Sequence, residues 1–132
     1  MPRCLTAVLA PLASLVLLVG CAGDAPLTLL ESDVAAPPEM QVRLSTDVVR
    51  DGGELSGGRF VMSGPIKDLG KAVTDTIARY ESNGWSVLSR DVSAAAATLR
   101  FAKSTRAVTV ELQRRRIDPG MSSAVVLVER SS

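Results

Sequence analysis

The stretch KDLGKAVTDTIARYESNGW, residues 67–85, decides the fold because it predicts the one clear helix of the region that follows the N-terminal apolar run. Its apolar side chains recur at spacings of four, four and three, at Leu69, Val73, Ile77 and Tyr80. This spacing places them in one stripe along a helix. Asn83-Gly84 marks the end, because glycine adopts the left-handed conformation common at helix C-termini. We therefore expect a helix over 67–83 with one face toward a core.

The sequence on both sides of this helix predicts strands. Before it, the alternating segments 41–49 and 59–63 flank a glycine-rich connection at 50–58. After it come four more strand candidates, at 85–91, 97–103, 107–113 and 123–129. Neighbouring strands with short turns are antiparallel, and one helix covers one face of such a sheet. The expected fold class is α+β, with one helix packed on an antiparallel sheet in the order ββαββββ.

The pattern within these segments also predicts which side chains are buried. Val42, Leu44 and Val48 are expected on one side of the first strand. The four aromatic residues all fall at expected core positions, namely Phe60, Tyr80, Trp85 and Phe101. Because sugar sites present exposed aromatic rings, buried ones argue against a stacking platform.

The N-terminus carries a second pattern, an apolar run over residues 5–19 that follows Arg3. As a helix this run spans ~22 Å, short of the ~30 Å hydrocarbon core, so it is typical of a secretory signal. It ends in Leu18-Val19-Gly20-Cys21, which resembles the lipobox of bacterial lipoproteins. The resemblance implies that residues 1–20 are removed and that the Cys21 thiol carries lipid. An ordinary cleaved signal and an uncleaved anchor are the alternatives.

Three parts of the chain follow from this boundary. Residues 1–20 are the expected signal peptide, and residues 21–40 the lipidated cysteine with a proline-rich, acidic tether. The apolar run LTLL at 27–30 is a candidate to dock, so the tether need not be wholly disordered. Extended, such a tether reaches at most ~65 Å. Residues 41–132 are the expected single small domain, which we expect to fold without the tether. Cys4 leaves with the signal, so the mature chain has no partner for a disulfide.

Composition limits the chemistry of the mature chain. It contains no histidine, and Cys21 is occupied by lipid, so Cys–His and Ser–His nucleophiles and soft metal sites are excluded. We predict no catalytic residue, metal or cofactor. Without residues 1–20, fourteen basic and fourteen acidic side chains remain, a balance that does not favour nucleic acid as a partner.

One run of charge stands out, Arg114, Arg115 and Arg116. It follows a predicted strand whose alternation would turn Arg114 toward the core, so we expect the strand to end or bend there. The run is a candidate contact for lipid phosphate or an acidic partner. The alternative is a solvated strand end.

A broader resemblance covers residues 58–129. The helix ending in Y…NGW, the strand with LRF and the strand with VTVEL resemble the small helix-on-sheet domains of envelope accessory lipoproteins of the NlpB type. The resemblance implies a structural or accessory binding module that is lipid-anchored outside the cytoplasm and meets an envelope protein. The alternative is a lipoprotein that binds a small ligand in a cleft between helix and sheet. Ala22 stands where Asp would signal retention at the inner membrane, so we expect the outer membrane, on its periplasmic side, if the cell has two membranes.

Overall fold

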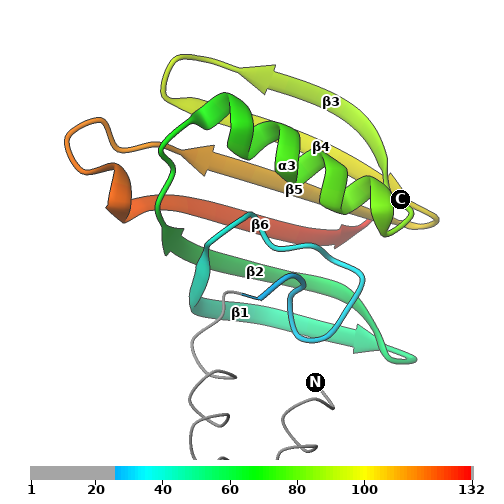
Figure 1. The fold of residues 1–132 in the computed structure, drawn as a ribbon. Helices are drawn as coiled ribbons and strands as arrows, with labels where there is room; N and C mark the ends of the chain where they lie inside the picture. Colours follow the sequence, from blue (N-terminus) through cyan, green and yellow to red (C-terminus); the bar gives the residue numbers. More distant parts are fainter. Residues whose placement is uncertain (1–25, 132) are drawn as a thin grey trace, which may run out of the picture.

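Six antiparallel strands and one α-helix form the fold in the computed structural model, which describes residues 26–131 (Figure 1). The elements are β1 (Gln41–Asp51), β2 (Glu54–Gly64), α3 (Leu69–Ser82), β3 (Ser86–Val92), β4 (Ala96–Lys103), β5 (Arg106–Gln113), the 3₁₀ helix η2 (Pro119–Met121) and β6 (Ser122–Arg130). The strand order in the sheet is β1-β2-β6-β5-β4-β3. The predicted fold class and element order are confirmed.

The sheet places β6, the last strand of the chain, between β2 and β5. Residues 58–64 of β2 pair with residues 122–128 of β6, and β6 pairs with β5 along its whole length. Helix α3 connects β2 to β3, the strand at the far edge, so the helix crosses the sheet (Figure 1). The chain therefore has two edge strands, β1 and β3, on opposite sides of the molecule.

The helix starts and stops close to the predicted residues. Asp68 is its N-cap and accepts a hydrogen bond from the Lys71 backbone N–H at 3.2 Å. Gly84 follows its end with a φ of 89°. One part of the predicted stripe differs, because Thr76 is fully buried while Ile77 is only partly so. Thr76 tolerates burial because its hydroxyl donates to the Ala72 carbonyl at 2.7 Å.

The core lies between α3 and the sheet and is built around the aromatic residues. All four are buried, as predicted. The Tyr80 ring stacks on Phe101 with centroids 4.1 Å apart, and Trp85 meets Tyr80 edge-on at 5.9 Å. Helix α3 therefore supplies Tyr80 to the centre of the core.

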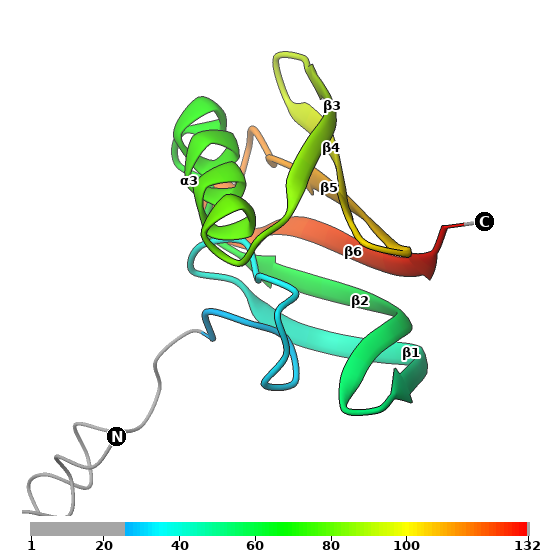
Figure 2. The same cartoon turned by 90° about the vertical axis from the view of Figure 1, so that its right-hand side faces the viewer.

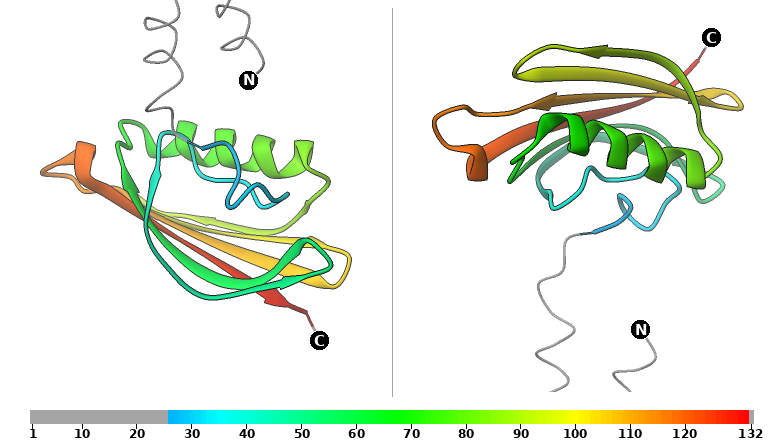
Figure 3. Two further views of the ribbon diagram at one scale, coloured as in Figure 1. Left: turned by 90° about the horizontal axis from the view of Figure 1, so that it is seen from below. Right: turned by 45° about the horizontal axis from the view of Figure 1, so that its top comes forward.

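The segment expected to be a tether is part of this core, which corrects the predicted boundary at residue 40. We call residues 26–40 the strap. It lies beside α3 on the same face of the sheet (Figures 2 and 3), and Leu29, Val34 and Met40 are at most 1% exposed. One helix is too narrow to cover six strands, so the inner face of β2 and β6 needs a second cover. Composition missed this because its prolines and acids are also typical of linkers.

The first hairpin differs from the prediction in two ways. Its connection is only Gly52-Gly53, both with positive φ, and β2 already begins at Glu54. In β1 the predicted apolar side is broken, because Val42 pairs with buried Met62 whereas Leu44 pairs with Val61 on the other face. Irregularities in the β1 register cause this change of face.

Candidate functional site

The predicted lipidation site, Cys21, lies outside the described residues, and so does the signal peptide. It remains a prediction. Within residues 26–131, no helix is long and apolar enough to cross a bilayer. Two clusters of charged side chains are candidates for a functional site. One is the arginine run, and the other is a group of paired charges around the strap.

The arginine run begins where β5 ends, as expected. The Arg114 backbone N–H donates to the Ala95 carbonyl at 2.8 Å, and its Nε donates to the Ile66 carbonyl at 2.9 Å. The Arg115 backbone N–H donates to Ser122 Oγ at 3.0 Å. Arg114 is therefore partly used to fix the turn, while the side chains of Arg115 and Arg116 are exposed.

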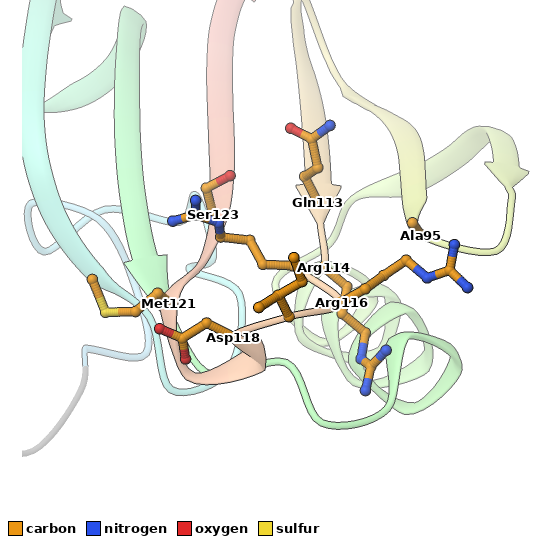
Figure 4. Close-up of a pocket in the computed structure, with 9 residues that line it drawn as sticks. Ala95, Gln113, Arg114, Arg116, Asp118, Met121 and Ser123 are labelled. Atoms are coloured by element: carbon orange, nitrogen blue, oxygen red, sulfur yellow. The ribbon is translucent and has the colours of Figure 1, made fainter.

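We call residues 114–121 the arginine loop. It borders an open hollow of about 880 Å³, with Ala95, Gln113 and Ser123 on its other side (Figure 4). The guanidinium groups around it point in different directions and do not converge (Figure 4). Ile117 in the same loop is fully exposed. An anion cage needs donors that meet at one point, so this loop lacks the geometry of a dedicated phosphate pocket.

The second cluster was not predicted and joins the strap to the β4–β5 hairpin. Asp33 Oδ1 and Oδ2 accept from Nη1 and Nη2 of Arg106 at 2.8 and 2.6 Å. Lys103 Nζ donates to Asp33 Oδ2 at 2.7 Å and to the Asn83 carbonyl at 2.7 Å. Arg106 also pairs with Glu54 at 3.0 Å, although its side chain is only 5% exposed. We call Asp33, Lys103 and Arg106 the clasp.

The electrostatics of the clasp favour its ionised form. The hydrogen bonds from Arg106 lower the pKa of Asp33 from 3.8 to about 2, with a smaller contribution from Lys103 and against the effect of burial. The same pairing raises the pKa of Arg106. Both partners therefore carry their full charges at neutral pH.

Trp85 forms the floor of the clasp. Its indole Nε1 donates to the Asp33 carbonyl at 2.8 Å. The guanidinium of Arg106 lies 5.0 Å from the centre of the ring, and Lys103 Nζ lies 6.0 Å away. Both cations are within reach of the ring face, where a cation–π interaction adds to the ion pair.

Two further side chains hold the strap to α3. The Tyr80 hydroxyl donates to the Ala35 carbonyl at 2.7 Å, and Arg79 Nη1 donates to the Ala36 carbonyl at 2.9 Å. Burial raises the pKa of Tyr80, so the phenol keeps its proton and remains a donor. The strap is thus fixed by its carbonyls as well as by its apolar side chains.

The contacts around the strap hold it against α3 and the sheet. Among the described residues, no buried side-chain nitrogen or oxygen lacks a hydrogen-bond partner. In the same part of the chain, no three acidic, histidine or cysteine side chains gather as metal ligands. Sequence reasoning missed the clasp because Asp33 lies 70 and 73 residues from its partners, and no local pattern reports such a pair.

Comparison with known proteins finds no match to this chain among protein-family models, curated proteins or solved structures.

Proposed function

We propose that this protein is a membrane-anchored bacterial lipoprotein whose domain is a structural or accessory binding module of the cell envelope. The observation that carries the proposal is Leu18-Val19-Gly20-Cys21 at the end of the apolar run 5–19. Lipid on Cys21 is the membrane partner, and two or three acyl chains hold a protein firmly. Ala22 favours the periplasmic side of the outer membrane where a cell has two membranes.

The packing of the domain supports a binding module over an enzyme or a ligand carrier. A small-ligand site needs a cleft of several hundred Å³ with converging polar groups. Between α3 and the sheet that space is filled by Tyr80, Phe101 and Val73, each fully buried. The hollow at the arginine loop is open and lies outside this interface. The surface of the domain is therefore where we place its function.

The anchoring part of the proposal is tested by Cys21→Ser, expressed in a bacterium fed labelled fatty acid. We expect an unprocessed precursor without label, because the serine hydroxyl does not form the thioether. The matched control is Cys4→Ser, which changes the other cysteine and leaves processing and labelling normal. Normal processing and labelling of Cys21→Ser would refute the lipoprotein assignment.

The binding part is tested by photo-crosslinking the intact lipoprotein in its own membranes. A probe is placed at exposed sites around the domain, and the crosslinked products are identified by mass. We expect one envelope protein to be captured from adjacent sites, with capture lost when untagged domain is added in excess. Scattered products that the competitor does not reduce would contradict a specific binding module.

A further inference from the structure

Exposed apolar side chains are concentrated at one edge of the molecule. Eleven large apolar side chains are exposed among the described residues, and six of them lie on the strap and on β1. The six are Leu27, Leu30, Val42, Leu44, Val48 and Val49. We call this set the strap edge. The other edge strand, β3, exposes three, and the arginine loop exposes two.

The described chain begins at this same edge. Its first residues lie beside β1 and β2 and away from β3 (Figures 1 and 2). Pro26 is five positions after Cys21, with residues 22–25 between them, and five extended residues span at most about 17 Å. A lipid on Cys21 therefore holds Pro26, where the strap begins, within about 17 Å of the membrane surface, whereas a tether to residue 40 would allow ~65 Å.

The strap is fixed tightly enough for this short distance to matter. Arg106 and Lys103 pair with Asp33, and the Tyr80 hydroxyl donates to the Ala35 carbonyl. Earlier in the strap, the guanidinium of Arg50 donates to the Leu30 carbonyl and joins the strap turn to β1. These contacts join the strap to β1 and to the core, so the strap keeps a fixed position along this edge of the sheet.

Leu30 has an unusual place in this surface. It sits at the tip of the strap turn with a φ of 51° and is 45% exposed, and Leu27, three residues earlier, is 69% exposed. Glycine or asparagine adopts such a backbone at less cost than leucine does. An exposed leucine in a strained conformation is explained when its side chain makes a contact outside the fold.

The backbone of β1 indicates which contact this is. An added strand from another protein needs a regular ladder of free N–H and C=O groups. β1 has register shifts at three places and a positive φ at Asp47, and such bulges oppose strand addition. A lipid surface needs no ladder, because headgroups and interfacial water hydrogen-bond to an irregular edge.

We propose that the strap edge rests on the membrane surface, with Leu27 and Leu30 at the boundary between headgroups and acyl chains. This inference rests on the proposed function, since it requires lipid on Cys21. It also orients the molecule. The β3 edge, on the opposite side of the sheet, points away from the membrane and toward other envelope proteins.

The test uses the full-length lipoprotein, lipidated in cells and reconstituted in vesicles of phosphatidylethanolamine and phosphatidylglycerol. Leu30→Cys carries an environment-sensitive fluorophore on the introduced thiol. Leu88→Cys is the matched control, a leucine of similar exposure, 56%, on β3. Spin-labelled lipid should quench the probe at residue 30 several-fold more than the probe at residue 88. Equal quenching at the two positions would overturn the proposal.

A third variant tests whether the short connection to the lipid is needed to hold the strap edge at the membrane. About twenty flexible Gly/Ser residues are inserted between Asp24 and Ala25, which lengthens the connection between Cys21 and Pro26 and leaves the strap unchanged. We expect lipid quenching at residue 30 to fall while fatty-acid labelling stays unchanged. Unchanged quenching would show that the short connection between Cys21 and Pro26 does not hold the strap edge at the membrane.

The remaining outcomes are also decisive. Protection of the residue 30 probe from aqueous iodide, without quenching by lipid, would replace the membrane with a protein occupant and overturn the inference. Absence of fatty-acid label in the parent protein would instead refute the proposed function, and the inference with it.

Discussion

The Asp33 carboxylate shows at the scale of one residue how the strap becomes part of the fold. It accepts from both Arg106 and Lys103, which come from the two ends of the β4–β5 turn. Arg106 is nearly buried, and a buried cation without its partner is destabilising. Asp33 therefore stabilises the fold by pairing with the positive charge of Arg106, which the β4–β5 hairpin places under the strap.

Asp33→Asn should lower the free energy of unfolding at pH 7 by about 1–2 kcal/mol, after allowance for solvent screening. The pKa of Asp33 is lowered from 3.8 to about 2 in the folded protein. A depressed pKa stabilises the fold above the unfolded pKa, and this stabilisation is lost as the pH falls through about 2. Urea unfolding followed by circular dichroism between pH 7 and pH 2 measures the difference.

The matched control is Asp75→Asn, which breaks the exposed pair with Lys71 on α3. An exposed helix pair contributes only about 0.3–0.5 kcal/mol. A loss for Asp33→Asn no greater than for this control, or a difference from the parent protein that does not shrink below pH 4, would contradict the role given to the clasp.

At the scale of elements, the strap crosses so close to the end of β2 that it leaves no room for a side chain at Gly64. A Cβ at Gly64 would lie 2.3 Å from the Glu39 carbonyl oxygen and 3.1 Å from the Met40 Cα. Both contacts are with backbone, so neither neighbour moves cheaply. The close crossing of strap and β2 therefore requires glycine at this position.

Gly64→Ala should destabilise the domain by about 2 kcal/mol or more, because strand and strap must separate. Gly70→Ala, in the first turn of α3, is the matched change, since its Cβ meets only Asp68 Oδ1 at 3.4 Å. There alanine should stabilise by about 0.5–1 kcal/mol. Thermal unfolding should therefore show a lower melting temperature for Gly64→Ala and a higher one for Gly70→Ala. An unchanged melting temperature for Gly64→Ala would show that the strap packs less closely on β2.

The arginine loop is the other element with a testable role. Replacing Arg114, Arg115 and Arg116 with serine should change stability by about 1 kcal/mol, most of it from the lost bond to the Ile66 carbonyl. We expect the unlipidated protein, parent or variant, not to float with anionic vesicles. Salt-sensitive flotation of the parent, abolished in the variant at an unchanged melting temperature, would assign the loop an anionic partner.

For the whole molecule, the strap decides where the folding unit begins. Leu29, Val34 and Met40 are essentially fully buried, and burying such side chains contributes about 1.5–3 kcal/mol each. Their sum is comparable with the net stability of a small domain, about 5–15 kcal/mol. The folding unit thus includes the strap residues from Leu29 to Met40, and the boundary predicted at residue 41 divides its core.

Residues 26–132 should therefore unfold cooperatively, whereas residues 41–132 should be unfolded or loosely packed. Trp85 is the only tryptophan and lies under the strap, so the shorter fragment should show a red-shifted, easily quenched emission. Calorimetry and tryptophan fluorescence of the two fragments provide the comparison. Equal melting temperatures would show that the strap contributes little to the core.

Local sequence patterns were enough to predict the elements whose signals come from near neighbours. The 3.6-residue stripe ending at Asn83-Gly84 predicted α3, and strand alternation with short turns predicted the six strands and their order along the chain, but not the place of β6 between β2 and β5. These patterns succeed because each depends on neighbours a few residues apart. The resemblance of Leu18-Val19-Gly20-Cys21 to a lipobox is equally local, so the lipid anchor is a prediction from the sequence alone.

The features that depend on distant partners became visible in the tertiary structure. The strap, residues 26–40, resembles a linker in composition, and it becomes a core element because α3 leaves the inner face of β2 and β6 uncovered. Asp33 acquires its pKa and its role from cations that the chain supplies 70 residues later. The physical reason is that burial and charge pairing are set by proximity in space, which local sequence patterns do not encode.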